Sequence, residues 1–538
     1  MARSSEMDAL ARASGGGAQA LAWSTSRWVV SGGTAALALA LLVTAAVVGF
    51  LHEDAYILFI YSRHLAETGQ ITFDAVHGPT EGATDFLWMW LIAQGMRLGA
   101  DPGFVAAALN ALGAGSLLSA LYRVHAPARW QAGVVWLVPL VLVSPFLGAA
   151  LGGFSVLFYV GLYAQVLVAL LHRRIRAAVV WSVLLCLTRP DAVVLTLGTL
   201  LPALYRFRFD RRVLATFAGA VLVGGAYFVW RKQYFGEWLP LPLMVKAQGD
   251  SLAESLVNNL MVLLPFAMLP WLHWRFGSRL SRFDVLSLLL PAALLWAALA
   301  LAHQSQNISY RFQAPIMVSL LMLLVSLRLP SRRWRLVAVL PFLLFGLKTL
   351  GGEARYLSTP SYINGLPLAL QQMGVVGPGT RIALTEAGRM PYYLPAQYMD
   401  LVGLNSREVA VGGLTVAKIQ AFQPDMVFLH HAGAYTPPVS DAAFVRVSRE
   451  DFLAHHWHPN GASDPVMRAP SLVGDWVRKA DRLDAIYFVR YGKGFFHVYL
   501  LDSRQVDPAA FERALRLSLS APVASHCAVS GHWPCARH

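Results

Sequence analysis

Long apolar segments alternate with short polar connections over most of the first 350 residues of the chain. A helix needs about 20 apolar residues to cross a membrane, and most of the segments approach that length. The pattern therefore predicts an α-helical polytopic membrane protein with about 11 transmembrane helices. The predicted spans cover approximately residues 28–51, 103–122, 130–147, 154–171, 177–187, 192–205, 213–230, 258–274, 285–302, 314–327 and 336–350.

The loop after the first span, residues 52–102, is long and only partly polar. Its segment 86–99, FLWMWLIAQGMRLG, is apolar and rich in tryptophan but too short to span a membrane. It predicts an interfacial helix with Trp88 and Trp90 at the level of the lipid headgroups. The segment 54–67 suits a second helix of this kind.

Residues 351–538 have a different pattern, in which short apolar runs are separated by segments rich in Pro, Gly and Asn. RIALT (381–385) and DMVFLHH (425–431) have the length and composition of strands. DAIYFVRYGKGFFHVYLLD (484–502) reads as a hairpin with its turn at the two glycines. This region is predicted to be a C-terminal soluble α/β domain.

Charge strengthens the membrane interpretation, because only 14% of the residues are charged while 56% are hydrophobic. The net charge of +14 arises largely from arginines in alternate loops, which is the pattern of cytoplasmic loops. No nucleic-acid-binding motif accompanies this charge, so no nucleic-acid partner is expected. The basic loops hold Arg123 and Arg129; Arg173, Arg174 and Arg176; Arg206, Arg208, Arg211 and Arg212; Arg275, Arg279 and Arg282; and Arg328, Arg332, Arg333 and Arg335.

This charge pattern divides the chain into three parts. Residues 1–27 are predicted to be a disordered cytoplasmic tail, followed by a first span that is retained rather than cleaved as a signal peptide. Residues 28–350 form the predicted transmembrane domain, and residues 351–538 the domain outside the cytoplasm. In that compartment Cys527 and Cys535 are able to form a disulfide, with two free thiols as the alternative.

Two adjacent carboxylates, Glu53 and Asp54, come directly after the first span on its outer side. Neighbouring carboxylates that lose water repel one another, which makes one of them a candidate base near neutral pH. Ordinary solvated carboxylates at the end of a span are the alternative. His455, His456 and His458 are interpreted as surface histidines, and no spacing indicates a metal site.

Cationic residues are predicted on the same outer side in three further motifs. The pair Arg189 and Asp191 in TRPD (188–191) is either a structural salt bridge or a site for an anionic headgroup. In the loop 231–248 and the segment 303–315, cations lie among aromatic residues and prolines. They suit a lipid phosphate, with snorkelling side chains as the alternative. These segments contribute Arg231, Lys246 and Tyr234, and Tyr310 and Arg311.

The order of these motifs resembles the GT-C superfamily of polyprenyl-phosphate-sugar glycosyltransferases, and within it the AftB-like arabinofuranosyltransferase group. The resemblance covers almost the whole chain after residue 50. It departs from the family pattern at Asp85, where Asn is usual, at Gly152–Val156 and at Leu241-Pro242. The matching segments are EDAY (53–56), EGATDFLW (81–88), TRPDA (188–192), RKQYFGEWLPLPLMVK (231–246), YRFQAP (310–315) and EAGRMPYYLPAQYMDLVGLNS (386–406).

The resemblance implies transfer of a sugar from a polyprenyl-phosphate donor to a glycan or glycoprotein acceptor, outside the bacterial cytoplasmic (inner) membrane. The arabinofuranosyl group is the expected sugar. Asp54 is the favoured catalytic carboxylate, with Glu53 as the other candidate. Arg189, Arg231, Lys246 and Arg311 are implied to bind the donor phosphate. Further site candidates are Asp191, Tyr56, Glu81, Tyr234 and Tyr310.

No cofactor is required for this reaction, and we expect a monomer that contacts membrane lipids. Two other functions stay open. A transporter or flippase of lipid-linked sugar would suit the many spans. However, no internal repeat is visible, and the candidate site residues gather at one end of the predicted transmembrane domain. A receptor or scaffold that binds envelope glycan through its soluble domain is the third.

Overall fold

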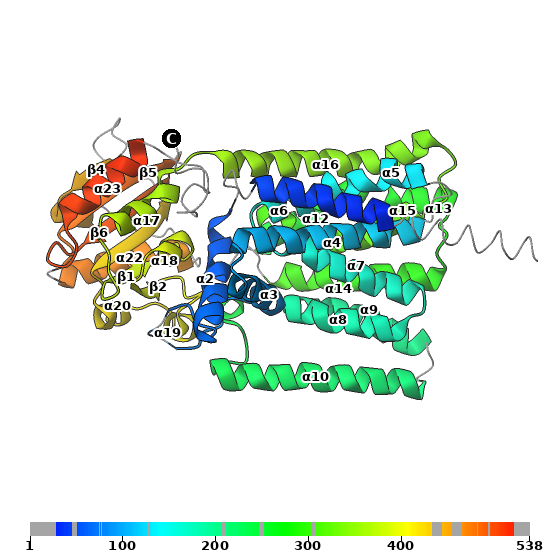
Figure 1. The fold of residues 1–538 in the computed structure, drawn as a ribbon, viewed down its shortest axis with the longest axis horizontal. Coiled ribbons are helices and arrows are strands. Elements are labelled where there is room, and N and C mark those ends of the chain that lie inside the picture. Colours follow the sequence, from blue (N-terminus) through cyan, green and yellow to red (C-terminus); the bar gives the residue numbers. More distant parts are fainter. Residues whose placement is uncertain are drawn as a thin grey trace, which may run out of the picture.

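The structure is a computed structural model in which a helical body lies beside a smaller domain built on a β-sheet (Figure 1). It describes residues 28–45, 51–74, 76, 78–125, 130–206, 210–246, 252–302, 307–432, 444–454, 465–480, 482–492 and 495–520. The predicted tail 1–27, the cysteines Cys527 and Cys535, and the histidines at 455, 456 and 458 lie outside these residues.

Within the described residues, six helices are long and apolar enough to cross a membrane, and a bent helix pair raises the number to seven. Four shorter apolar helices complete the helical body. Each predicted span overlaps one of these elements. The long helices are Trp28–Ala45, α4 (Pro102–His125), α10 (Arg211–Phe235), Leu252–Phe276 (α12 Leu252–Met261, η1 Leu264–Phe266 and α13 Leu269–Phe276), α14 (Arg282–Leu301) and α16 (Arg332–Ser358).

The bent pair consists of α5 (Trp130–Leu142) and α6 (Pro145–Leu151), whose axes meet at 45°. Its break follows from the sequence, since Ser144 caps α6 and Pro145 occupies its first turn. The short apolar helices are α7 (Val156–Leu171), α8 (Ile175–Thr188), α9 (Ala192–Arg206) and α15 (Ala314–Ser326).

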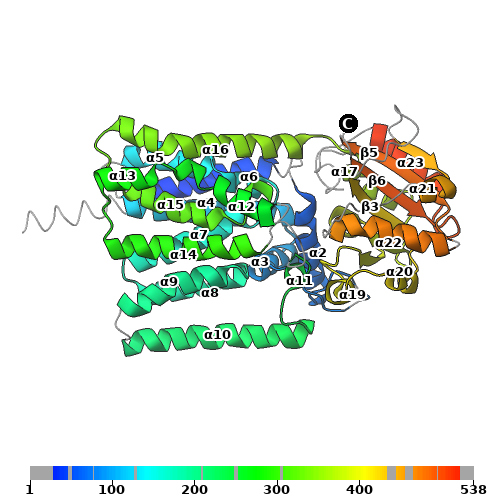
Figure 2. The ribbon, with the colours of Figure 1, turned by 180° about the vertical axis from the view of Figure 1, so that it is seen from behind.

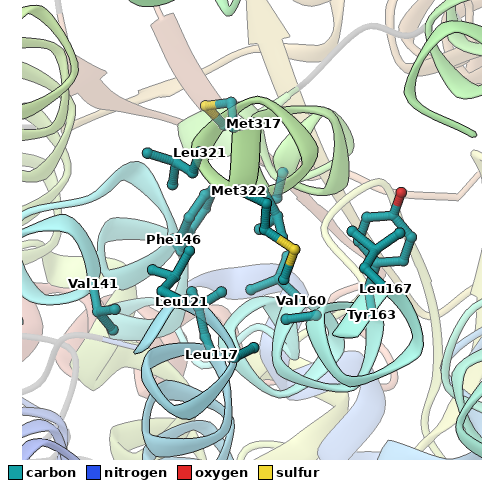
Figure 3. Close-up of a cluster of buried hydrophobic side chains, with 14 of the residues drawn as sticks. Leu117, Leu121, Val141, Phe146, Val160, Tyr163, Leu167, Met317, Leu321 and Met322 are labelled. Atoms are coloured by element: carbon teal, nitrogen blue, oxygen red, sulfur yellow. The ribbon is translucent and has the colours of Figure 1, made fainter. Parts of the chain in front are cut away.

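The helical body packs most closely where glycines allow two backbones to approach. A Cβ on Gly113 of α4 would lie 2.2 Å from the carbonyl oxygen of Leu157, and one on Gly161 would lie 2.6 Å from that of Gly113. Small residues at helix contacts are typical of membrane proteins. Beside this contact, side chains of α4, α7 and α15 form the apolar core, which includes Leu117, Val160 and Met322 (Figure 3).

Helix α10 lies at the edge of the helical body in both views (Figures 1 and 2). Only 6% of its most apolar window is buried. Val221, Leu222 and Val223 are among its exposed apolar side chains. An apolar helix exposed in this way fits a lipid environment and not water.

Two further helices, α2 (Glu53–Thr68) and α3 (Phe86–Arg97), occupy the predicted loop and confirm the two short helices expected there. Trp90 is 42% exposed, but Trp88 is only 1% exposed and packs with Tyr56 and Phe59. The expectation that Trp88 lies among lipid headgroups is therefore wrong, because the side chain fills the core beneath α2.

The smaller domain contains a six-stranded mixed sheet with the strand order β2-β1-β3-β6-β5-β4. Strand β1 runs parallel to β2 and β3, and the remaining neighbours are antiparallel. The predicted strands and hairpin are confirmed by β1, β3, β5 and β6. The strands are β1 (Arg381–Leu384), β2 (Gln397–Asp400), β3 (Met426–Ala432), β4 (Phe444–Val447), β5 (Ala485–Gly492) and β6 (Phe495–Leu501).

Helices cover both faces of the sheet and bury alternate side chains of its strands. Tyr487 and Tyr499 pack toward α17 and α23, whereas Ile486 and Leu500 pack toward α22. The helices of this domain and of its junction are α11 (Leu241–Lys246), α17 (Tyr362–Gln372), α18 (Arg389–Tyr393), α19 (Arg407–Gly412), α20 (Val416–Phe422), α21 (Arg449–Ala454), α22 (Pro465–Lys479) and α23 (Pro508–Ser520).

Helix α2 lies between the helical body and the sheet domain (Figures 1 and 2). The Tyr61 hydroxyl donates to Asn405 at 3.2 Å, and Arg63 donates to the carbonyl of Tyr392 at 2.6 Å. Helix α16 reaches the same junction, because it continues to Ser358 and not to residue 350 as predicted. These contacts bring the beginning of α2 against the sheet domain.

Candidate active site

The acidic pair forms the first turn of α2, which begins at Glu53. His52 caps this turn, since its Nδ1 accepts a hydrogen bond from the backbone N–H of Asp54 at 3.2 Å. A helix N-terminus stabilises negative charge through its unpaired N–H groups and its dipole. Both carboxylates lie at this helix end, but burial raises the pKa of Glu53 in spite of it, and the two side chains have different partners.

Glu53 is bound by the sheet domain. Its Oε1 accepts from the backbone N–H groups of Gly388 at 2.9 Å and Arg389 at 2.7 Å. Its Oε2 accepts from the guanidinium of Arg389 at 2.9 Å, and that guanidinium also donates to the carbonyl of Leu51 at 2.6 Å. Both carboxylate oxygens thus serve to fasten α2 to the segment after β1. We name these contacts the Glu53 clamp.

Asp54 faces a cavity of about 600 Å³ between the helical body and the sheet domain, and 38% of its side chain is exposed. Its Oδ2 lies 3.3 Å from a guanidinium nitrogen of Arg311. The cavity has the size of a ligand pocket. Asp54 therefore combines access to a ligand with a cationic neighbour, as a catalytic carboxylate needs.

Arg189 and Arg311 both lie close to one aromatic ring. Their guanidinium carbons are 5.2 Å and 5.1 Å from the centroid of Phe312. Arg189 pairs with Asp191 at 3.0 Å, so the predicted Arg–Asp salt bridge is present, and it lies 3.9 Å from Asp85. The two arginines and the carboxylates of Asp191 and Asp85 thus form a buried cluster of mixed charge, which contacts Asp54 through Arg311.

Asp85 is a member of this group that the sequence pattern did not single out as chemical. Its Oδ2 accepts from the hydroxyl of Ser155 at 2.5 Å. Its position is visible in the sequence only as an acid where the family has Asn. Ser155 belongs to the 152–156 segment that also departs from the family, so the structure joins these two departures in one contact.

Arg231 belongs to a different contact. It donates from Nε to Glu81 at 2.6 Å, and a second nitrogen binds the other oxygen of the same carboxylate. Each side chain of the pair is 8% exposed. The structure thus joins two predicted site residues, and the carboxylate of Glu81 already occupies one edge of the Arg231 guanidinium.

Replacement of Arg231 by Met is expected to lower the free energy of unfolding by about 3 kcal/mol, because Glu81 is left buried without its counter-charge. The double variant Arg231→Met/Glu81→Gln should recover part of this loss. Thermal and denaturant unfolding of the purified protein measure both. In the control Arg478→Met, the partner Asp475 stays in water, so the effect should be about 0.5 kcal/mol or less. Equal losses for Arg231 and Arg478 would contradict a buried pair.

The remaining candidates are dispersed. Tyr56 is fully buried against Arg389 and Tyr392. Tyr234 accepts from the backbone N–H of Ile71 at 3.0 Å. Tyr310 has a left-handed backbone with φ of 54° and packs on Phe345. Lys246 ends α11, and its side chain lies outside the described part of the structure.

The lining of the cavity also contains residues that the motif search missed. Among them are Glu353 at the end of α16, Glu386 after β1, His430 on β3 and His497 on β6. A signal existed only for Glu386, which opens the family-like segment 386–406. The two histidines look like ordinary strand residues in the sequence, because only the pairing of β3 with β6 brings them together.

Burial keeps several of these groups uncharged. It raises the pKa of Glu386 well above its usual value, and the nearby carboxylates of Glu53 and Asp54 act in the same direction. Burial also lowers the pKa of His430 and, together with the neighbouring His430, lowers that of His497 well below its usual value. These shifts favour the uncharged forms of Glu386, His430 and His497. Within the described residues, no group of three His, Cys, Asp or Glu side chains is arranged to hold a metal ion.

His52 gives the junction a pH dependence. Burial lowers its pKa from 6.5 to about 4, so the unfolded chain takes up a proton at a pH where the folded protein does not. The contribution of His52 to stability is complete above about pH 6.5 and falls by about 1.4 kcal/mol per pH unit between 6.5 and 4. We expect wild-type protein to lose this contribution in acid.

The comparison variant is His52→Asn, which keeps a capping oxygen that does not titrate in this range. The melting temperature of the wild type relative to this variant should be lower at pH 5 than at pH 7.5. Unfolding of the full-length protein in detergent at the two pH values measures it. The same difference at both pH values would show that His52 is free to protonate in the folded state.

Comparisons with known proteins agree on the architecture. Residues 368–483 match a family described as a domain of unknown function (DUF8728), and no curated protein matches the sequence. The crystal structure of ArnT from Cupriavidus metallidurans bound to undecaprenyl phosphate is similar over 86% of this chain and 97% of that one, with a TM-score of 0.53 and 14% identity. The apo structure of the same protein gives a TM-score of 0.52 and 15% identity over the same shares of the two chains. The chain therefore has the fold of ArnT, a GT-C fold of membrane helices with a small sheet domain in its C-terminal region.

Proposed function

We propose that this protein is a membrane glycosyltransferase that moves a sugar from a polyprenyl-phosphate donor to an acceptor hydroxyl. The observation that carries the proposal is Asp54, which lines a cavity between the two domains and contacts Arg311, while Arg189 lies against the same aromatic ring as Arg311. The fold is shared with a protein whose crystal structure holds undecaprenyl phosphate. A carboxylate next to buried cations suits the attack of a hydroxyl and the departure of a phosphate.

In this reaction the bond between the anomeric carbon and the phosphate oxygen breaks, and a bond to the acceptor oxygen forms. With inversion, Asp54 removes the proton of the acceptor hydroxyl. With retention, it attacks the anomeric carbon or stabilises its positive charge, and the acceptor hydroxyl then completes the transfer. In both routes Arg189 and Arg311 bind the polyprenyl phosphate and offset the charge that develops on it.

The contacts change the roles proposed for two other residues. Glu53 holds the sheet domain through the Glu53 clamp, so we assign the chemistry to Asp54. Arg231 is neutralised by Glu81 in a buried pair, so we assign it to the stability of the loop that precedes α3. Lys246 stays a phosphate-binding candidate on the basis of its motif alone.

We further propose D-arabinofuranose as the sugar and a cell-envelope glycan or surface protein as the acceptor, on the outer side of the bacterial cytoplasmic membrane. The ordered motifs and the basic loops support this orientation, with the sheet domain outside the cytoplasm. The protein is proposed to act as a monomer, without a cofactor.

Comparison of envelope glycans from a deletion strain and a complemented strain by mass spectrometry tests the sugar and the acceptor. Loss of arabinofuranosyl residues on deletion, and their return with the wild-type gene but not with an Asp54→Asn gene, is expected. Purified protein should also transfer the sugar from polyprenyl-phosphate arabinofuranose. Movement of lipid-linked sugar across vesicles without a covalent product would overturn the proposal in favour of a flippase, and glycan binding without turnover would favour a receptor.

A further inference from the structure

The cavity beside Asp54 has two chemically different sides. Toward the membrane helices, Arg311 lies 3.3 Å from Asp54, and Arg311 and Arg189 both lie against the ring of Phe312. Toward the sheet domain, Glu386, His430 and Asn364 line the cavity, and Arg389, the only cation among the described residues of this lining, is engaged by Glu53. The first side suits a phosphate, because phosphate is bound by cations. The second side offers a phosphate only neutral groups.

The neutral side is an ordered network. His430 and His497 are joined through Nδ1 and Nε2 at 3.2 Å, and His497 Nδ1 is bound to the Tyr362 hydroxyl at 2.6 Å. His430 Nδ1 lies 3.6 Å from a carboxyl oxygen of Glu386. His497 is 2% exposed, so its role is to position His430, which lies at the cavity wall.

Each of these groups is able both to donate and to accept a hydrogen bond. A neutral imidazole has one N–H and one bare nitrogen, a neutral carboxyl group has an O–H and acceptor oxygens, and the Asn364 amide has both kinds. A sugar hydroxyl also donates and accepts. Such a wall is complementary to a neutral polyol, whereas an anion would meet few donors and a cation few charges.

Two residues of α16 that line the same cavity also point to a ligand. Glu353 Oε1 is buried at the cavity and has no hydrogen-bond partner among the described residues, while Oε2 accepts from Ser309 at 3.2 Å. A buried acceptor without a partner is costly, and a ligand hydroxyl would satisfy it. Tyr356, which is 54% exposed, lines the same cavity and offers an aromatic face. Aromatic faces pack on the apolar C–H face of a sugar ring.

We propose that Glu353, Glu386, His430, Asn364 and Tyr356 form the acceptor subsite and that this subsite takes a neutral carbohydrate. The inference rests on the proposed function and makes it more specific, because it selects a glycan over a surface protein as the acceptor. His497 and Tyr362 are positioning residues of the subsite. The sugar hydroxyl that reacts lies between this wall and Asp54.

Full-length protein in detergent tests the subsite in two ways. Direct binding of a neutral arabino-oligosaccharide is measured by titration calorimetry, with a Ser- and Thr-containing peptide as the competing probe. Transfer from polyprenyl-phosphate arabinofuranose then gives the KM of each substrate and the rate of donor hydrolysis by water. The oligosaccharide, but not the peptide, is expected to bind the wild type.

The variants separate recognition from folding. His430→Ala and Tyr356→Ala should each raise the KM of the oligosaccharide at least tenfold, while the donor KM and the hydrolysis rate stay within about twofold. Glu386→Gln, which keeps a neutral hydrogen-bonding group, should bind the oligosaccharide better than Glu386→Ala. The matched control Asp475→Asn, on the exposed face of α22, should match the wild type. Where His430→Ala does not fold, His430→Gln replaces it, with a smaller rise in KM.

The outcomes distinguish this inference from the proposed function. Loss of oligosaccharide binding in His430→Ala supports the subsite even where the wild type transfers no sugar from the lipid donor, a result that would overturn only the proposed reaction. An unchanged acceptor KM in all the variants, with transfer intact, would overturn the subsite alone. Tighter binding of the peptide, lost on the same substitutions, would also overturn it.

Discussion

Replacement of Asp54 by Asn is expected to lower kcat for sugar transfer by a factor of about 10² to 10⁴, which is the usual contribution of a positioned base. The variant keeps the size of the side chain and the first turn of α2, and Arg311 loses only a partly exposed partner. The KM of the donor should therefore change little. Initial rates with polyprenyl-phosphate arabinofuranose and a neutral oligosaccharide measure the effect.

Glu53→Gln is the neighbouring comparison. This substitution removes the charge that Arg389 binds, so we expect a lower melting temperature and a smaller loss of kcat in the folded fraction than for Asp54→Asn. Asp475→Asn controls for the loss of a surface carboxylate. Wild-type turnover in both Asp54→Asn and Glu53→Gln would remove the catalytic assignment altogether. A larger loss in Glu53→Gln would transfer the chemistry to Glu53.

Replacement of Gly388 by Ala is expected to open the Glu53 clamp. An added Cβ would lie 2.1 Å from the backbone carbonyl oxygen of Glu53 and 2.6 Å from its Oε1. The backbone of α2 is unable to yield without losing the hydrogen bonds from residues 388 and 389. Overpacking costs about 1–3 kcal/mol, and each lost hydrogen bond to a charged group about 1.5–3 kcal/mol. A destabilisation on the order of 4 kcal/mol is therefore expected.

Thermal unfolding of the full-length protein measures this loss, and limited proteolysis reports whether the sheet domain has separated from the helical body. The control is Gly379→Ala in the same domain, where an added Cβ meets nothing within 4 Å. We expect Gly388→Ala to lose transfer activity together with stability, whereas Gly379→Ala keeps both. Equal melting temperatures for the two variants would show that the clamp contributes little to the junction.

The periodicity of apolar residues and the positions of the charged residues predict the fold, because both depend on whether a segment meets lipid or water. Each span places an apolar stretch in lipid, and the basic residues of a loop disfavour its passage across the membrane. Both signals are therefore local in the sequence. The bend between α5 and α6 is also encoded locally, by Ser144 and Pro145. Trp88 was predicted wrongly for a related reason, since amphipathic character does not distinguish a lipid headgroup from the protein core under α2.

The site was predictable only in part, because its contacts join distant parts of the chain. The pair Arg189–Asp191 spans two residues and could be predicted as a salt bridge. Glu53 and Arg389 are 336 residues apart, and no pattern around either residue names the other. The same holds for His430 and His497, which only the register of β3 and β6 brings into contact. The carboxylates were thus found as candidates, but their division between anchoring and chemistry required the structure.

The Glu53 clamp also determines when, during synthesis of the chain, the site around Asp54 is assembled. The first turn of α2 leaves the ribosome early, but its carboxylate finds its partners only after residue 389 has been synthesised and the strand before it has folded. Under the proposed function, a chain interrupted before that point has Asp54 without the wall that faces it. Incomplete chains in the membrane therefore hold Asp54 without the proposed acceptor subsite, so transfer to an acceptor begins only after the sheet domain has been synthesised and folded.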